Sequence, residues 1–382
     1  MTEGARPFVL LTHPGAELYG SDRMAIRSVT ALVASGCRVS VVLPCEGPLV
    51  RVLERAGADV LVLKIPVLRA ELLKPLATVR ATFSILIGVM RAWALIRRQR
   101  PDVVYVNTLT QPSWFAAARL GRVPLVAHVH EAKPMIQPLL QRCLVLPLVL
   151  ATRTIAVSDA IKEFIVANIL FPRSRDIVVI HNGILLGEPS KEIGRNPATV
   201  LLVGRITPNK GQDLLVSAIA LLRQRGTHVD AVIAGDSFAG YEWYKQSLQD
   251  LAQAQGVAAQ VSFPGFVADP GHLYRSAAVC VVPSEFEAFG LVAVESMFSG
   301  CPTIVSADSG GLTEIVSNGV TGWTFEAGSV VSLAETIGLV LAQPRVAREV
   351  ARRGQADVIA RFHVDRFDQT LVGTVQEVWH VA

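Results

Sequence analysis

The sequence predicts an α/β protein with two doubly wound parallel-sheet domains that face each other across a cleft. Its 382 residues exceed what a single hydrophobic core usually organises. Short apolar, β-branched runs alternate with helical segments, stop at a polar stretch over residues 186–197, and then start again. Charge divides near the same place. Residues 1–183 hold 22 Lys/Arg and 12 Asp/Glu, a balance of +10, and the remaining 14 and 20 give −6.

The individual elements follow from hydrophobic periodicity and turn signals. In the first half the expected strands are 8–12, 38–43, 60–63, 103–107, 125–128, 154–157 and 178–180, with helical periodicity over segments such as 22–35 and 49–56. In the second half the expected strands are 199–203, 231–234, 260–263, 279–282 and 303–305, followed by a helical tail from about residue 331. The expected organisation is an N-terminal domain (1–185), a linker (186–197), a C-terminal domain (198–360) and a C-terminal helix (361–382) that packs back on the N-terminal domain.

Composition excludes several classes of protein. Half of the residues are apolar and the mean hydropathy is +0.42, as in a well-packed globular chain. Five scattered cysteines without a C-x-x-C pair favour a reducing, cytoplasmic compartment and argue against a zinc site. The chain has no signal-peptide pattern and no apolar run of the roughly 18 to 20 residues that span a bilayer. Without a G-x-G-x-x-G or Walker sequence, a dinucleotide oxidoreductase or P-loop NTPase is not expected.

The stretch from Pro283 to Gly300 carries the most chemical information. Glu287 and Glu295 are separated by seven residues, the first on a loop after a strand and the second about one turn inside a helix. Backbone N–H groups at the start of a helix bind anions, and carboxylates accept hydrogen bonds from hydroxyls. The pattern therefore suggests a sugar nucleotide. Taken alone, such a pair usually belongs to an ordinary helix with a solvated glutamate at each end.

Two cations follow the strand at residues 199–203. Arg205 and Lys210 lie on one short loop at the expected mouth of the sheet, which suits a diphosphate, although isolated loop charges are usually only solvated. The chain contains no D-x-D sequence, so a metal-bridged diphosphate is not suggested. Fixed side-chain cations would then stabilise the departing negative charge.

Together these stretches resemble the family 4 retaining glycosyltransferases of GT-B architecture, which have two Rossmann-like domains. The resemblance covers most of the chain and is strongest over 199–325. It rests on the stretches VSDAIKEFI (157–165), VIHNGI (179–184), GRITPNKG (204–211), AGDS (234–237), FPGFV (263–267), VVPSEFEAFGLVAVESMFSGCPTIV (281–305) and SGGLTEIVSNGVTGW (309–323).

The resemblance implies a nucleotide-sugar site in the second domain. Arg205 and Lys210 would grip the diphosphate, Glu287 would contact the sugar near the reacting centre, and Glu295 would accept hydrogen bonds from the ribose. Main-chain atoms would complete the site, those of Phe289, Gly290 and Leu291 at the sugar and phosphate and those of Phe266 and Val267 at the base.

In the first domain the resemblance implies a Gly-rich loop after the first strand. Here that loop reads Leu18 to Arg23, with Tyr19 in place of the first of two adjacent glycines, so Gly20 would approach the diphosphate and Tyr19 would narrow the site or touch the acceptor. His130, followed by an acidic residue, would contact the sugar, although a lone histidine at a strand end is often structural. Asn107 and Ser158 are expected to line the acceptor cleft.

The implied activity is transfer of a hexose-type sugar from a UDP- or GDP-sugar to a hydroxyl acceptor, with retention of anomeric configuration and with neither metal nor cofactor. Glu287, His130, Arg205 and Lys210 would carry the catalysis. A non-catalytic nucleotide-sugar-binding or scaffold protein, and a GT-B-type phosphorylase or epimerase, remain as alternatives. The first would show no turnover and no loss on Glu287→Ala.

The acceptor side of the reaction is less defined. The segment 76–98 is mostly apolar and carries Arg80, Ser84, Arg91 and Arg98 on one helical face, and a second apolar stretch runs over 136–151. With the balance of +10, these stretches predict peripheral contact with an anionic membrane surface and a lipid-linked or cell-envelope acceptor. A core helix with one wet edge explains the first segment equally well. No nucleic-acid module is recognisable, so nucleic acid is not an expected partner.

Overall fold

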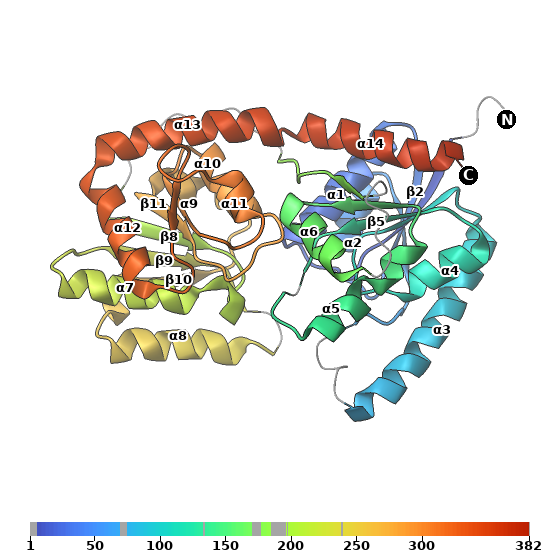
Figure 1. Ribbon diagram of the computed structural model, residues 1–382, viewed down its shortest axis with the longest axis horizontal. Coiled ribbons are helices and arrows are strands. Elements are labelled where there is room, and N and C mark those ends of the chain that lie inside the picture. Colours follow the sequence, from blue (N-terminus) through green and yellow to red (C-terminus); the bar gives the residue numbers. More distant parts are fainter. Residues whose placement is uncertain are drawn as a thin grey trace. The chain divides into compact units, whose positions relative to one another are not determined.

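The computed structural model describes residues 6–68, 75–132, 134–169, 177–184, 196, 198–237 and 240–381, and of residues 75–82 and 381 it describes the backbone. The chain forms two compact units (Figure 1). The N-terminal unit comprises Met1–Gly183 and Asp365–Ala382, and the C-terminal unit comprises Ile184–Val364. The helix α14 (Val364–Val381) thus belongs, apart from its first residue, to the N-terminal unit.

The N-terminal unit is built on a seven-stranded parallel sheet with the order β3-β2-β1-β4-β5-β6-β7. Its strands are β1 (Phe8–Thr12), β2 (Arg38–Leu43), β3 (Asp59–Val62), β4 (Val103–Val106), β5 (Leu125–Val129), β6 (Arg153–Ala156) and β7 (Ile177–Val179). The central strands are apolar and buried along their whole length, as expected for a sheet covered on both faces. The strand order reverses between β1 and β4, which pair directly.

Helices cover this sheet, and one of them has exposed apolar side chains. They are α1 (Gly20–Ala34), α2 (Pro48–Arg55), α3 (Pro75–Gln99), α4 (Ser113–Gly121), α5 (Pro138–Val145), the 3₁₀ helix η2 (Leu146–Leu150), α6 (Asp159–Asn168) and α14. Helix α3 packs against α4 and buries Ala92 and Ile96, whereas Phe83, Leu86 and Met90 of α3 remain 66%, 58% and 60% exposed.

The C-terminal unit repeats the design with a six-stranded parallel sheet of order β10-β9-β8-β11-β12-β13. The strands are β8 (Thr199–Val203), β9 (Asp230–Ala234), β10 (Val261–Gly265), β11 (Val279–Val282), β12 (Thr303–Ser306) and β13 (Trp323–Phe325). The helices are α7 (Gln212–Gln224), α8 (Glu242–Ala254), α9 (Gly271–Ser276), α10 (Leu291–Phe298), α11 (Leu312–Ile315), α12 (Val330–Ala342) and α13 (Pro344–Phe362), with the 3₁₀ helices η4 (Pro208–Lys210) and η5 (Ala258–Gln260). The order reverses between β8 and β11.

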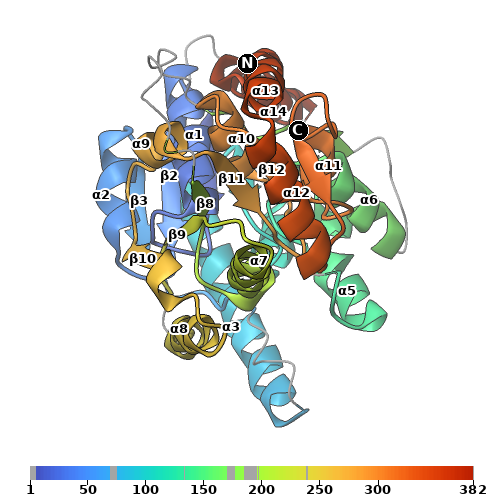
Figure 2. The same cartoon turned by 90° about the vertical axis from the view of Figure 1, so that its left-hand side faces the viewer.

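A large apolar core holds the sheet of the C-terminal unit to its helices α7 and α12. Val200 and Leu202 of β8 pack with Leu215 of α7 and with Leu333 and Ile337 of α12. Helices α7 and α12 contact each other and lie side by side in Figures 1 and 2. This packing fixes the direction of β8 and therefore the position of the loop that follows it.

The expected fold class, two parallel-sheet α/β domains, is confirmed. The strands at 8–12, 38–43, 199–203 and 279–282 have the expected bounds, and the other predicted strands except β10 differ by one residue at one or both ends. Strand β10 starts and ends later than expected, and β13 was not expected at all. The predicted linker 186–197 lies outside the described residues except for Asn196, whose backbone N–H donates to the carbonyl of Ser276.

No single helix within the described ranges is long and apolar enough to cross a bilayer, although the bent pair α12–α13 meets the criteria of length and composition. Ile337 and Val340 of α12 and Val350 of α13 belong to the core of the C-terminal unit. The apolar character of this pair is therefore explained by packing inside the protein.

Candidate active site

Each sheet places polar residues at the point where its strand order reverses. In open parallel sheets ligands bind beyond the carboxyl ends of the strands at such a reversal. In the N-terminal unit His13 follows β1 and Asn107 follows β4, the two strands that flank the reversal. In the C-terminal unit the loops after β8 and β11 carry Arg205, Lys210 and Glu287.

Four side chains of the N-terminal unit form a continuous hydrogen-bonded chain. Asp22 Oδ1 lies 2.8 Å from His13 Nε2, and His13 Nδ1 lies 2.9 Å from Asn107 Nδ2. Asn107 Oδ1 in turn lies 2.8 Å from His130 Nε2. The chain crosses the carboxyl ends of β1, β4 and β5, so the register of the sheet brings His13, Asn107 and His130 together, and α1 adds Asp22.

The electrostatics of this edge favour a neutral His130. Burial lowers the pKa of His130 well below its ordinary value, and the neighbouring His128 and His13 rings lower it further. Burial also lowers the pKa of His128, to about 3. Glu131 has a raised pKa because it is buried, which its hydrogen bonds from Thr108 and from the backbone N–H of Leu109 partly offset.

His128 lies in the core of the N-terminal sheet and has a structural role. Its side chain is fully buried, and Tyr105 OH lies 2.6 Å from its Nδ1. Burial raises the pKa of Tyr105, so its hydroxyl stays protonated and donates. The His128 ring also stacks against Phe367 of α14, with ring centroids 6.4 Å apart.

The Gly-rich loop leads directly into α1. Gly20 is the first residue of the helix, and Tyr19, half-buried, precedes it. The backbone N–H of Tyr19 donates to Asp22 Oδ2 at 2.8 Å, which fixes the start of the helix. The expected contact of Gly20 with a diphosphate and the expected role of Tyr19 stay predictions.

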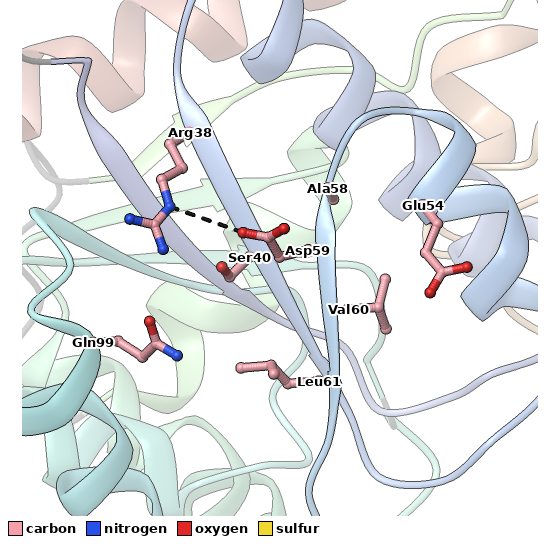
Figure 3. A pocket seen from close by; sticks show the side chains of 8 residues that line it. All are labelled: Arg38, Ser40, Glu54, Ala58, Asp59, Val60, Leu61 and Gln99. Atoms are coloured by element: carbon pink, nitrogen blue, oxygen red, sulfur yellow. Dashed lines mark ion pairs between the residues drawn. The ribbon is translucent and has the colours of Figure 1, made fainter.

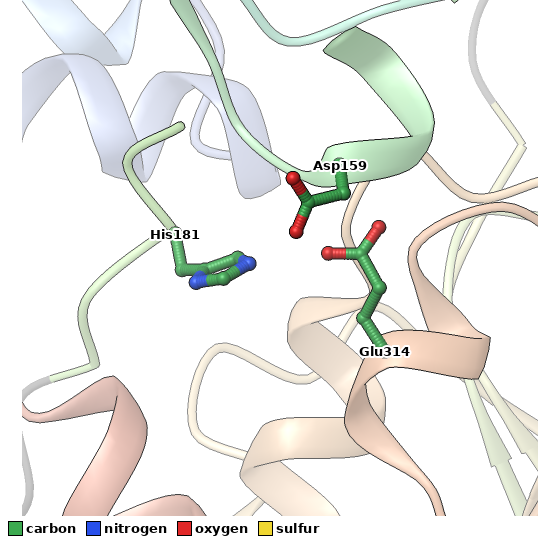
Figure 4. Close-up of side chains that lie close together, drawn as sticks. All are labelled: Asp159, His181 and Glu314. Atoms are coloured by element: carbon green, nitrogen blue, oxygen red, sulfur yellow. The ribbon is translucent and has the colours of Figure 1, made fainter. Parts of the chain in front are cut away.

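Ser158 and its neighbours occupy the edge beyond β6 and β7. Ser158 is buried and accepts a hydrogen bond from the backbone N–H of Ile161 at 3.1 Å, as an N-cap residue does. Helix capping accounts for this serine, and its expected place in an acceptor cleft stays a prediction. Figure 4 shows Asp159 at the start of α6 and His181 after β7 directed toward each other, with a carboxylate oxygen and a ring nitrogen within 4.8 Å.

In the C-terminal unit the loops after β8 and β11 are fastened to each other. The backbone N–H of Glu285 donates to the carbonyl of Asn209 at 3.0 Å. Gly211 has a φ of +69°, and a Cβ at this position would lie 2.2 Å from the carbonyl oxygen of Pro283. Only glycine fits both the left-handed backbone and this close approach. The sequence K-G in the matched stretch therefore reflects a packing need between the two loops.

Lys210 and Glu287 meet across these loops. The Lys210 ammonium donates to Glu287 Oε1, and the hydroxyl of Ser284 donates to the same oxygen at 2.8 Å. The main chain of Glu287 is held on both sides, since its N–H donates to the carbonyl of Ser309 at 3.1 Å and its carbonyl accepts from Gly311 at 2.9 Å.

The backbone of the first of these loops is also fixed. The carbonyl of Arg205 accepts a hydrogen bond from Gln212 Nε2 at 2.7 Å. Gln212 is the first residue of α7 and is buried, so it ties the loop to the start of that helix. Arg205 and Lys210 therefore extend from a loop whose main chain is anchored at both ends.

The two glutamates have different surroundings. Glu295 lies on α10, and its Oε2 accepts a hydrogen bond from the hydroxyl of buried Tyr274 at 3.3 Å. Glu287 is instead engaged by Lys210 and Ser284. The two carboxylates are thus held separately and point to different partners, as two distinct roles would require.

The remaining predicted residues lie at the same edge of this sheet. Gly290 precedes α10 with a φ of +113°, and Leu291 begins the helix, whose first N–H groups have no partner within it. Phe289 is buried with its ring against Phe362, centroids 5.3 Å apart, so its backbone is the part that can meet a ligand. Phe266, 53% exposed, and Val267 follow β10.

A separate hollow of about 470 Å³ lies elsewhere in the N-terminal unit (Figure 3). Arg38 and Asp59, 3.9 Å apart, border it, and they are the first residues of β2 and β3. This hollow is at the amino ends of the strands, whereas the polar residues described above follow the carboxyl ends.

Sequence reasoning missed several residues of these clusters. Ser284 and Tyr274 each engage one of the two glutamates, and His13 and Asp22 extend the chain from His130. His13 directly follows the first strand, which is a detectable signal. Tyr274 carries none, because its contact with Glu295 depends on how α9 packs.

Family models match nearly the whole chain. Residues 19–187 match the model described as Glycosyltransferase Family 4, and residues 188–357 match the one described as Glycosyl transferases group 1. The boundary between the two matches falls close to the division into two units. Each half is therefore similar to the corresponding half of known glycosyltransferases.

Curated relatives agree with these matches. The D-inositol 3-phosphate glycosyltransferase of Streptomyces scabiei is 30% identical over 329 residues, which cover 77% of this chain and 71% of the relative. The enzyme of that name from Gordonia bronchialis is 35% identical over 189 residues, covering 48% of this chain. The match spans only 40% of the length of the Gordonia relative.

Solved structures share the fold over almost the full length. Anabaena HepE, crystallised in complex with UDP and glucose, superposes with a TM-score of 0.80 at 24% identity, covering 96% of this chain and 99% of HepE. Sucrose-phosphate synthase from Thermosynechococcus elongatus gives 0.78 at 20% identity, covering 99% and 100%. At these identities the likeness establishes the architecture.

Proposed function

Because this chain belongs to glycosyltransferase family 4 and has the GT-B fold, we propose that it transfers a hexose-type sugar from a nucleoside-diphosphate sugar to a hydroxyl acceptor. The observation that carries this proposal is the pairing of Lys210 with Glu287 at the reversal between β8 and β11. A cation and a carboxylate at that edge suit two adjacent groups of a nucleotide sugar, the diphosphate and the hydroxyls of the attached sugar.

UDP is the favoured nucleotide, with GDP as the alternative. HepE, which shares the fold, is described in complex with UDP and with UDP-glucose. In the present chain Glu295, steadied by Tyr274, would accept from the ribose hydroxyls. The exposed end of β10, at Phe266 and Val267, would meet the base through main-chain atoms.

The reaction would proceed with retention and without a metal. Arg205 and Lys210 would stabilise the negative charge of the departing diphosphate, which itself would assist in deprotonating the acceptor hydroxyl. Glu287 would hold the sugar hydroxyls near the reacting carbon, and His130 would contact the same sugar. The N–H groups at the start of α10, after Gly290, would donate to sugar and phosphate oxygens.

The acceptor would be a lipid-linked or cell-envelope glycan, reached at the cytoplasmic face of a membrane. Phe83, Leu86 and Met90 form an exposed apolar stripe on α3 at helical spacing, and Arg91 and Arg98 of the same helix are exposed. An apolar stripe beside cations is the pattern of a helix that lies on an anionic bilayer. Further apolar surface on the N-terminal unit comes from the exposed residues Met135 and Leu139 near α5.

Co-sedimentation with vesicles tests this membrane contact. At low salt, wild-type protein should bind vesicles of anionic phosphatidylglycerol and bind neutral phosphatidylcholine less, and Leu86→Glu should reduce the binding. Leu339→Glu, at a position 50% exposed on α12, introduces the same change outside the stripe and should leave binding intact. Absence of wild-type binding to the anionic vesicles would remove the membrane from the proposal.

A screen of nucleotide sugars tests the enzyme assignment. UDP-, GDP- and ADP-sugars are added without metal, in the presence of a chelator, and both the thermal shift and the release of nucleoside diphosphate are measured. We expect one of them to raise the melting temperature and to be hydrolysed slowly, with hydrolysis lost in Glu287→Ala. If no nucleotide sugar stabilises the protein, the assignment fails.

The same screen separates the alternatives. A binding or scaffold protein would be stabilised without any turnover, and Glu287→Ala would change nothing. A phosphorylase would require orthophosphate and form a sugar phosphate. An epimerase would convert the nucleotide sugar without releasing nucleoside diphosphate.

A further inference from the structure

Three of the four side chains in the hydrogen-bonded chain at the edge of the N-terminal sheet are almost inaccessible to water. The side chains of His13 and Asp22 are 1% and 5% exposed, and Asn107 is 1% exposed. A Cβ on Gly15 would lie 3.0 Å from Asp22 Oδ1, so the carboxylate is closely surrounded. Buried polar groups of this kind require complete hydrogen bonding, and each partner therefore constrains the next.

The carboxylate sets the direction of the whole chain. The Asn107 amide is oriented with Nδ2, which can only donate, toward Nδ1 of His13. His13 therefore accepts through Nδ1 and donates through Nε2 to the Asp22 carboxylate. The same orientation turns Asn107 Oδ1 toward His130. An amide oxygen only accepts, so His130 carries its proton on Nε2.

The other ring nitrogen of His130 is thereby left as an acceptor. Its Nδ1 makes no hydrogen bond with any residue in the described part of the chain. Burial keeps the pKa of this ring low, so the imidazole stays neutral. A neutral ring with a free lone pair accepts a hydrogen bond from a hydroxyl group.

Asp22 also holds the Gly-rich loop. Its second oxygen, Oδ2, accepts from the backbone N–H of Tyr19, the residue directly before Gly20. One carboxylate therefore fixes both the start of the loop and, through His13 and Asn107, the ring of His130. The Gly-rich loop and His130 are the two parts of this unit that would meet the nucleotide sugar. Asp22 therefore fixes their positions relative to each other.

We propose that Asp22 is a positioning residue that acts through His13 and Asn107 to hold His130 as the Nε2–H tautomer, with Nδ1 presented to a hydroxyl of the transferred sugar. This inference rests on the proposed function for its substrate, but the tautomer itself exists without substrate. The side chain of Asp22 would contact neither sugar nor nucleotide.

Asp22→Asn provides a sharp test because the two oxygens of Asp22 face different kinds of donor. The N–H of Tyr19 can only donate, so the remaining oxygen of the substituted side chain must face it and the new amide NH₂ must face His13. His13 then accepts through Nε2 and donates through Nδ1, the Asn107 amide turns over, and His130 is left with its proton on Nδ1. The substitution reverses the tautomer while the loop keeps its hydrogen bond.

The readout is ¹⁵N NMR of protein labelled at histidine, in which the protonated and unprotonated nitrogens of a neutral imidazole have well-separated shifts. The His130 signals are assigned as those lost in His130→Gln. We expect Nε2–H in the wild type and Nδ1–H in Asp22→Asn. Wild-type protein with Nδ1–H, a measurement that needs no variant to fold, would overturn the proposal, as would an Asp22→Asn protein with an unchanged tautomer.

A second variant restores the proposed direction without Asp22. In the Asp22→Asn/Asn107→Asp protein the carboxylate at position 107 accepts from His130, so the Nε2–H tautomer should return. Tyr105→Phe, which removes a buried hydroxyl from the same sheet but outside the chain, should leave the tautomer unchanged. A change of the His130 tautomer in this control would contradict the assignment of the effect to Asp22.

Kinetics connect the tautomer to the reaction. With the nucleotide sugar found in the screen, Asp22→Asn should lower kcat about 100-fold, as expected when the partner that orients a functional imidazole is changed. KM should change little, because the loop at Tyr19 is preserved. A merely structural Asp22 would lower the melting temperature without changing the tautomer or kcat. If the wild type turns over no nucleotide sugar, the proposed function fails, whereas the NMR result still decides the tautomer.

Discussion

The pairing of Lys210 with Glu287 leads to an unexpected prediction: Glu287→Gln should bind UDP more tightly than the wild type and yet lose transfer. In the ligand-free protein Lys210 donates to Glu287, so a diphosphate must compete with that carboxylate for the ammonium. Glutamine keeps the size and the hydrogen bond from Ser284 but removes the charge. UDP lacks the transferred sugar, whose hydroxyls Glu287 would hold, so UDP binding would lose nothing that Glu287 supplies.

The magnitude follows from the exposure of the pair. The side chains of Lys210 and Glu287 are 26% and 16% exposed, so the pair is neither fully desolvated nor free in water. A partly exposed ion pair contributes about 1 kcal/mol net. If UDP must break most of this ion pair when it binds, removal of the ion pair should tighten UDP binding about fivefold, since about 1.4 kcal/mol corresponds to a factor of ten.

Isothermal titration of UDP into four proteins measures the effect: wild type, Glu287→Gln, Lys210→Met and the double variant. Lys210→Met should weaken binding by about tenfold or more, as expected for loss of a hydrogen bond from a charged group. In the Lys210→Met background, Glu287→Gln should no longer tighten binding, because there is no ammonium to release. The non-additivity isolates the competition from other effects.

Glu285→Gln is the matched control, since Glu285 is exposed on the same loop and loses the same charge. Equal tightening in Glu285→Gln would mean that general repulsion of the diphosphate, and not competition for Lys210, is responsible. Weaker UDP binding in Glu287→Gln would refute the reasoning, because Glu287 would then contribute to binding the nucleotide itself.

Two further predictions concern stability. Gly211→Ala should destabilise the C-terminal unit by about 2–4 kcal/mol, because it combines a left-handed backbone with a clash against the carbonyl of Pro283. Gly226→Ala, at a φ of +81° with open space around it, should cost about 1 kcal/mol. Chemical denaturation measures both losses, and equal losses in the two variants would contradict the clash. The pKa of His128 is about 3 in the fold against 6.5 in the unfolded chain, so protons bind the unfolded chain first and stability is lost as pH falls below 6.5. Between pH 7.5 and pH 5 this loss amounts to about 2 kcal/mol, at 1.36 kcal/mol per pH unit below 6.5. His128→Gln keeps an acceptor for Tyr105, and its free energy of unfolding should fall by about 2 kcal/mol less than that of the wild type between pH 7.5 and pH 5. An identical pH dependence in the wild type and in His128→Gln would contradict the assignment to His128.

Local patterns predicted most of the sheet elements because each strand carries its own signal. The run at 8–12 is apolar and β-branched, is followed by a polar turn, and forms β1 with the expected bounds. Strand β13 (Trp323–Phe325) was missed because its sequence, Trp-Thr-Phe, lacks the run of apolar β-branched residues that revealed the equally short β7 (Ile177–Val179). It exists through pairing with β12, which is a tertiary interaction.

The candidate site, too, was predictable from local sequence only in part. Arg205, Lys210 and Glu287 were predicted because each lies just after a strand, and parallel strands that end at one edge bring such residues together. The contact between Lys210 and Glu287 themselves spans 77 residues and depends on β8 and β11 being neighbours. The place of His13 beside Asn107, across 94 residues, likewise depends on the register of β1 against β4. Local sequence contains no information on such pairings.

The two units share a sheet topology but differ in the electrostatics of the residues at the strand reversal. At the reversal in the C-terminal sheet, the partly exposed ammonium of Lys210 is paired with Glu287, and a cation there suits a diphosphate that becomes more negative as it departs. At the reversal in the N-terminal sheet, burial and neighbouring rings keep His130 uncharged. In the proposed reaction the sugar develops positive charge, and an imidazolium beside it would raise the barrier. A neutral ring with Nδ1 as acceptor instead holds a hydroxyl without opposing that charge, so the buried chain from Asp22 to His130 supplies the neutrality and direction that the chemistry at this end of the substrate requires.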